Sequence, residues 1–171
     1  YNPKNETMAT GSCNSCPQFQ TPQNFNLGSM GGFFTYQEML DILDSMATKF
    51  PNLITVKDSI GAYLTDEGRP LHYVKISDNP NTNETEPQVL YTSLHHAREA
   101  ESLSQLIFYM WYLLENYSTD AEVQYLINNT EMYFIPCVNP DGYVYNETTN
   151  PNGGGMWRKN RHDNGDGTIG V

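Results

Sequence analysis

One stretch of the sequence, residues 89–115, constrains the fold more than any other. It opens with Val-Leu-Tyr-Thr-Ser-Leu at 89–94, a run typical of a buried strand. A polar cluster, His-His-Ala-Arg-Glu, follows at 95–99, and apolar residues then recur at the three- and four-residue steps of a helix: Leu103, Leu106, Ile107, Met110, Leu113 and Leu114. The cluster therefore lies at a strand-to-helix junction. Open α/β sheets bind their ligands at that edge, outside the carboxyl ends of the strands.

Within this cluster, His96 and Glu99 stand three residues apart. Two side chains at that separation in one helical turn can point at a common object. A neutral imidazole nitrogen and a carboxylate oxygen are both ordinary zinc ligands. Spacing alone also permits a simpler interpretation, in which Glu99 complements the helix dipole and His96 is a solvated loop residue.

The rest of the chain alternates helical and extended patterns. Thr35 and Glu38 predict a capping box that starts a helix ending near residue 50. Further helices are expected at about 99–117 and 120–128. Strands are expected at 53–60 and 71–76, paired through a turn at 66–70, and at 132–138, where Asn-Pro-Asp-Gly at 139–142 ends the strand as a turn.

Strands and helices in this order predict an α/β domain of three αβα layers around a mixed, largely parallel sheet. Residues 1–30 are rich in Asn, Gln, Pro, Ser and Thr and have no apolar periodicity, so they are expected to form a flexible polar tail or linker. Residues 31–171 then carry the domain.

Charge and cysteine content narrow the class of protein. A formal net charge of -11 and a pI near 4.5 argue against nucleic-acid binding, which needs a positive face. No uninterrupted apolar run of about 18 residues predicts a membrane span. Cys13 and Cys16 can form at most a small local disulfide, and Cys137 is expected as a buried thiol. The acidic balance suits a soluble, secreted protein.

Three motifs in order, His96-x-x-Glu99, Asn-Pro-Asp-Gly at 139–142 and Trp157-Arg158-Lys159-x-Arg161, closely resemble the zinc metallocarboxypeptidases of the carboxypeptidase A/B and T type. The resemblance covers about residues 31–171. It implies one Zn²⁺ at a catalytic site and peptide or protein C-termini as substrates.

The resemblance also implies roles for individual residues. His96 and Glu99 look like two of the three protein ligands of the zinc ion, and Arg98 is similar to the arginine that contacts the substrate chain beside the metal. Arg158 looks like the arginine that polarises the scissile carbonyl and stabilises its oxyanion. In this chemistry a metal-activated water hydrolyses the C-terminal peptide bond.

Family members continue with a second histidine ligand and a glutamate general base, and neither follows within these 171 residues. The chain therefore resembles the amino-terminal half of a catalytic domain, incomplete at its C-terminus. Alone it is expected to be inactive, with the missing C-terminal half as its partner. Two alternatives remain open, namely a catalytically silent binding or scaffold domain and a zinc-dependent deacylase on the same fold.

A second metal is weakly indicated. Asp163-Asn164-Gly165-Asp166-Gly167 has the oxygen-rich composition of a partial calcium loop, although it lacks the distal acidic ligand of an EF-hand. Ca²⁺ is therefore a minor expectation beside zinc.

Overall fold

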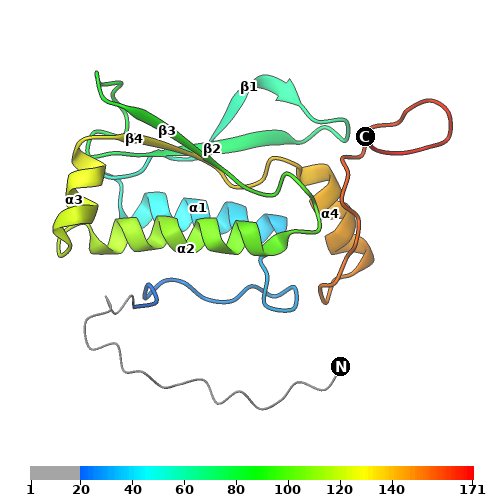
Figure 1. The fold of residues 1–171 in the computed structure, drawn as a ribbon, viewed down its shortest axis with the longest axis horizontal. Coiled ribbons are helices and arrows are strands. Elements are labelled where there is room, and N and C mark those ends of the chain that lie inside the picture. Colours follow the sequence, from blue (N-terminus) through cyan, green and yellow to red (C-terminus); the bar gives the residue numbers. More distant parts are fainter. Residues whose placement is uncertain (1–19) are drawn as a thin grey trace, which may run out of the picture.

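The computed structural model of the protein describes residues 20–171, in which helices cover one face of a four-stranded sheet (Figure 1). In chain order the elements are α1 (Tyr36–Lys49), β1 (Asp58–Leu64), β2 (Pro70–Ile76), β3 (Gln88–Thr92), α2 (Ala100–Asn116), α3 (Ala121–Asn128), β4 (Glu131–Ile135) and α4 (Pro140–Thr149). None of the helices in this part of the chain has the length and apolar content needed to cross a bilayer. The expected pairing of Cys13 with Cys16 lies outside the described residues.

The sheet is mixed and has the strand order β1-β2-β4-β3. β2 runs antiparallel to both β1 and β4, and β3 runs parallel to β4, with Val89 opposite Met132 and Tyr91 opposite Phe134. The expected α/β class and mixed sheet are confirmed, with one parallel pairing among these four strands. β1 starts later than the sequence suggests and bulges near Gly61, whose positive φ interrupts its register with β2.

Local signals at the helix starts act as the sequence predicts, with one exception. Thr35 and Glu38 form the capping box of α1, and Asp120 caps α3. The expected turn at 139–142 is wrong, because these residues begin α4. Asn139 is its N-cap, accepting a hydrogen bond from the Gly142 N–H, and Pro140 occupies the first helical position.

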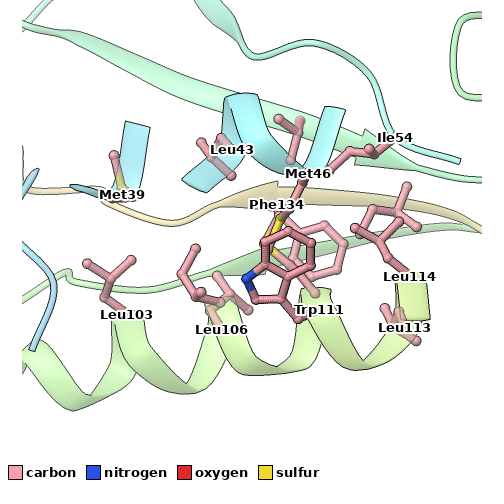
Figure 2. Packing of buried hydrophobic residues seen from close by; sticks show 14 of the residues in the cluster. Met39, Leu43, Met46, Ile54, Leu103, Leu106, Trp111, Leu113, Leu114 and Phe134 are labelled. Carbon is pink, nitrogen blue, oxygen red and sulfur yellow. The ribbon is translucent and has the colours of Figure 1, made fainter. Parts of the chain in front are cut away.

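The core lies between the sheet and the pair of helices α1 and α2. Figure 2 shows side chains of both helices pointing toward Phe134 of β4. Met39, Leu43 and Met46 follow the inner face of α1, and Trp111 packs edge-on against Phe50 at 6.3 Å between ring centroids. Each fully buried apolar side chain contributes roughly 1.5–3 kcal/mol. Cys137 is also buried, as expected, and this burial raises the pKa of its thiol.

The opposite face of the sheet carries no helix within residues 20–171 (Figure 1). Leu90 is 60% exposed there, and Ile60, Tyr133 and Ile135 line a shallow hollow of about 500 Å³ with their neighbours. β3, expected to be buried, is the edge strand of this sheet. The second helical layer of a three-layer domain is therefore not among the described residues.

Residues 20–33 pack against the outer side of the helical layer (Figure 1). The Glu115 carboxylate accepts hydrogen bonds from the backbone N–H groups of Gln23 and Asn24, and the Phe25 ring packs edge-on against Phe108. Met30 is buried. The described part of the expected tail is thus a packed segment, because Phe25 and Met30 pack against the core although the sequence around them has no periodic pattern.

A buried ion pair joins β2 to the amino end of β4. The Lys75 ammonium donates to Glu131 at 2.9 Å and to the Thr82 carbonyl at 2.6 Å. Glu131 also accepts from the Gln88 side chain and the Glu84 N–H. The hydrogen bond from Lys75, followed by those from Gln88 and Glu84, lowers the pKa of Glu131 to about 2.

Replacing Glu131 by Gln is expected to lower the free energy of unfolding by about 3–5 kcal/mol, because the Lys75 ammonium then stays buried without its counter-charge. Urea unfolding measures the difference. Asp44→Asn is the matched control. It breaks the more exposed Lys57–Asp44 pair and should cost less than about 1 kcal/mol. Equal losses in the two variants would contradict this account.

The same residue predicts an acid dependence. Because the pKa of Glu131 is lower in the folded protein than its ordinary 4.5, the unfolded chain takes up the proton first as the pH falls. Its stabilisation is therefore complete above about pH 4.5 and is lost as the pH falls toward 2. Glu131→Gln should show a flatter stability profile over that interval.

Candidate functional site

The candidate site lies where the parallel strands β3 and β4 end. Backbone pairing continues past both strands: the Ser93 N–H donates to the Ile135 carbonyl, and the Asn139 N–H donates to the Leu94 carbonyl. Leu94 is buried and has a φ of 50°, in the left-handed region that a branched side chain rarely adopts. This strained residue turns the chain out of the sheet immediately before His95 and His96.

Three of the four site residues predicted from the sequence lie together. His96 Nδ1 is 2.8 Å from Glu99 Oε1, and Arg158 Nη2 is 2.5 Å from His96 Nε2. Glu99 is the residue before α2, and its side chain makes no capping bond, so its carboxylate faces the imidazole. The side chains of His96 and Glu99 face each other as metal ligands would, and their role as ligands stays a prediction.

The hydrogen-bonding capacity of the three groups indicates what fits between them. A guanidinium only donates, so His96 Nε2 accepts from Arg158, and Nδ1–H donates to Glu99. A cation that replaces this proton would find one nitrogen and one carboxylate oxygen. Two tetrahedral zinc ligands stand about 3.4 Å apart, so a small outward movement of the two side chains accommodates the ion. The donor set fits zinc.

Arg158 is the cation of its motif that bonds to the candidate site, through His96. The Lys159 ammonium donates a hydrogen bond to the Gly170 carbonyl. The Arg161 guanidinium lies 4.0 Å from the Tyr145 ring centroid and 4.7 Å from that of Trp157, and it also bonds Glu67. These two residues hold their loop in place, whereas Arg158 lines a cleft of about 430 Å³ with His96.

Arg98 lies beside this group. It is exposed and lines a neighbouring cavity of about 530 Å³ together with Glu99, Gln105 and Met156. Among the described residues, no hydrogen bond or ion pair joins Arg98 to His96, Glu99 or Arg158. Its expected contact with a substrate chain stays a prediction.

No third zinc ligand accompanies His96 and Glu99 within residues 20–171. The one group of three or more potential ligands in this range is elsewhere, at Asp78, Glu84 and Glu86, on the loop before β3. His162 instead pairs with Asp66 at 3.0 Å, which raises the pKa of the histidine.

The partial calcium loop at 163–167 is not supported. Asp163 accepts a hydrogen bond from the Gly165 N–H, and Asp166 accepts from the N–H and hydroxyl of Thr168, which lowers the pKa of Asp166. These carboxylates stabilise the turns of the loop itself.

Sequence reasoning missed two buried residues beside the site, Asn139 and Asn146. Asn139 is the N-cap of α4 and Asn146 lies within this helix, whose start was expected to be a turn. Both bond to the loops that carry His96 and Arg158. An available signal was Asn139 followed by Pro140, the pair that often marks an N-cap and the first helical position.

Comparisons with known proteins identify the family. The sequence profile of the zinc carboxypeptidase family matches residues 39–171. A zinc carboxypeptidase of Saccharothrix mutabilis subsp. capreolus is 35% identical over 148 residues, which are 86% of this chain and 32% of that protein. Rat carboxypeptidase A2 is 30% identical, with the same coverage of both chains. The chain thus spans about a third of the length of these curated relatives.

Solved structures give the same fold. Carboxypeptidase A from Helicoverpa armigera superposes with a TM-score of 0.67 at 32% identity, over 83% of this chain and 33% of that one. Thrombin activatable fibrinolysis inhibitor superposes with a TM-score of 0.71 at 23% identity, over the same shares of the two chains, and this likeness concerns the fold alone. From its profile match and its relatives, the chain belongs to the zinc carboxypeptidase family.

Proposed function

We propose that the protein is a secreted, zinc-dependent carboxypeptidase that hydrolyses the C-terminal peptide bond of peptides and proteins. The observation that carries the proposal is the convergence of His96, Glu99 and Arg158 at one strand edge, with ligand atoms 2.8 Å apart and the guanidinium beside them. Family membership supports the same reaction class.

Each residue has a distinct role in this proposal. His96 and Glu99 hold the metal through Nδ1 and the carboxylate. Bound zinc would supply a Lewis acid and lower the pKa of its water to about 7. Arg158 lines the cleft, and its guanidinium N–H groups stabilise negative charge that develops on the scissile carbonyl oxygen. Arg98, in the adjoining cavity, contacts the substrate chain.

We infer further that a segment outside these residues completes the site. Two protein ligands leave zinc open to two more, and the two carboxylates that line the cleft among the described residues are already paired, Asp66 with His162 and Asp141 with Arg69. The exposed apolar face of the sheet and the greater length of the relatives support such a segment. Residues 1–171 alone are therefore expected to bind zinc weakly and to hydrolyse no peptide.

In the full-length protein, His96→Ala should weaken zinc binding by more than about 100-fold, because even residues that only support a ligand commonly contribute about 10–100-fold. Competition with a chromophoric chelator measures the dissociation constant. His95→Ala is the control: the neighbouring histidine bonds Thr92 at 3.2 Å and should leave the affinity unchanged. If His96→Ala and the wild type bound zinc with equal affinity, His96 would not be a zinc ligand.

The reaction class is tested with peptides that differ only in a free or amidated C-terminus. The full-length protein should release C-terminal residues from the free peptide, leave the amidated one intact, and lose activity to a zinc chelator. Equal rates on both peptides would refute an exopeptidase. Release of acyl groups alone would favour a deacylase, and no hydrolysis with normal zinc binding would favour a silent binding domain.

Arg158→Ala is expected to lower kcat by about 10²–10³, the usual loss when one oxyanion donor is removed. Zinc affinity should stay the same, because the guanidinium is not a ligand. Lys49→Ala removes a cation on the far side of α1, bonded to Asn24, and should leave kcat unchanged. A normal kcat in Arg158→Ala would exclude this residue from the chemistry.

A further inference from the structure

The loops that carry His96 and Arg158 run antiparallel, and two side chains of α4 bracket them. The Asn139 amide donates to the carbonyl of His95, the residue before His96. It also donates to the carbonyl of Lys159, the residue after Arg158. The Asn146 amide donates to the carbonyl of Ala97, the residue after His96. It also donates to the carbonyl of Trp157, the residue before Arg158. Each asparagine therefore bonds both loops, on opposite sides of the facing pair.

Each amide donates two hydrogen bonds and accepts one. Asn139 donates to His95 and Lys159 at 3.3 and 3.0 Å, and its oxygen accepts from the Gly142 N–H at 3.1 Å. Asn146 donates to Ala97 and Trp157 at 3.0 and 2.7 Å, and its oxygen accepts from the Trp157 N–H at 2.9 Å. Only a carboxamide offers two donors and an acceptor on one short side chain.

α4 is well suited to hold these amides in register. Asn139 and Asn146 are seven positions apart, two helical turns, so they project from one face of a single rigid element. Both are buried, with 8% and 4% exposure. A Cβ atom on Gly142 would lie 2.5 Å from the Lys159 carbonyl oxygen and 2.7 Å from the Ala97 Cβ, so the first turn of α4 touches both loops closely.

Between the two asparagines, the loops contact each other through one backbone hydrogen bond. It runs from the Ala97 N–H to the Arg158 carbonyl at 3.0 Å. A single bond fixes distance but not the tilt of one loop against the other. The two asparagines add a contact on either side of it. The three points together determine how far the Arg158 guanidinium lies from His96.

We propose that Asn139 and Asn146 are positioning residues, forming a two-point clamp that sets the distance between the metal-binding loop and the oxyanion arginine. The catalytic consequence rests on the proposed function, whereas the clamp itself does not. Neither asparagine contacts substrate or metal in this account. Both act by setting the position of Arg158 relative to His96.

The clamp is tested first by hydrogen exchange in the full-length protein. Asn139→Asp and Asn146→Asp keep the acceptor oxygen, and with it the Gly142 and Trp157 bonds, but lose both donors. The Ala97 amide should then exchange about tenfold faster or more, the factor that corresponds to one ordinary net hydrogen bond. Amides of β4 should keep their wild-type rates, which separates loop opening from global destabilisation.

Kinetics test the catalytic consequence. Each Asn→Asp variant should lower kcat/KM for a C-terminally free peptide by about tenfold. Added to Arg158→Ala, the same change should cause no further loss, because the clamp acts through that arginine. Asn139→Ser and Asn146→Ser repeat both measurements without a buried charge, in case the aspartate variants do not fold.

Asn129→Asp is the matched control. It removes an amide donor at the end of α3, bonded to the Tyr125 carbonyl at 2.8 Å, and should change neither readout. Wild-type exchange at Ala97 in the Asn139 and Asn146 variants would overturn the clamp, as would kinetic losses that multiply with Arg158→Ala. If the wild-type protein hydrolyses no peptide, the proposed function fails, and exchange at Ala97 alone decides the clamp.

Discussion

The parallel pairing of β3 with β4 is the constraint on which the site depends. The two strands pair from Gln88–Glu131 to Thr92–Ile135, so their carboxyl ends reach the same edge of the sheet. Backbone bonds beyond the strands keep residues 93–94 beside 135–139. The segment that becomes the metal-binding loop and the segment that becomes α4 therefore start next to each other, although about 40 residues separate them in the sequence.

Local elements could be predicted from the sequence because their causes are local. The Thr35–Glu38 capping box, the Asp120 cap and the apolar period of residues 103–114 each act within a few residues, and each helix forms where expected. α4 was missed because its pattern is not amphipathic: it buries Asp141, Gly142 and Asn146 beside Tyr143. A helix that buries polar side chains against backbone carbonyls has no apolar stripe from which it could be predicted.

The assembly of the site could not be derived from spacing. His96 and Glu99 are neighbours on one turn, but Arg158 is 62 residues beyond His96, and it arrives there through contacts of Asn139, Asn146 and Ala97. In the sequence, only the resemblance to a known family linked these motifs. What covers the exposed face of the sheet was equally beyond prediction, because an apolar strand pattern indicates that a face is to be covered without indicating what covers it.

Burial divides the residues of this site into two kinds. The side chains of His96 and Glu99 are 40% and 51% exposed, as groups that must meet a ligand have to be. Asn139, Asn146 and the strained Leu94 are buried, and the amides of the two asparagines donate to backbone carbonyls of the same loops. A backbone carbonyl has a fixed position relative to its own Cα, so a bond to it orients the adjacent side chain whatever that side chain is. The exposed residues can therefore determine the chemistry while the buried amides determine the geometry.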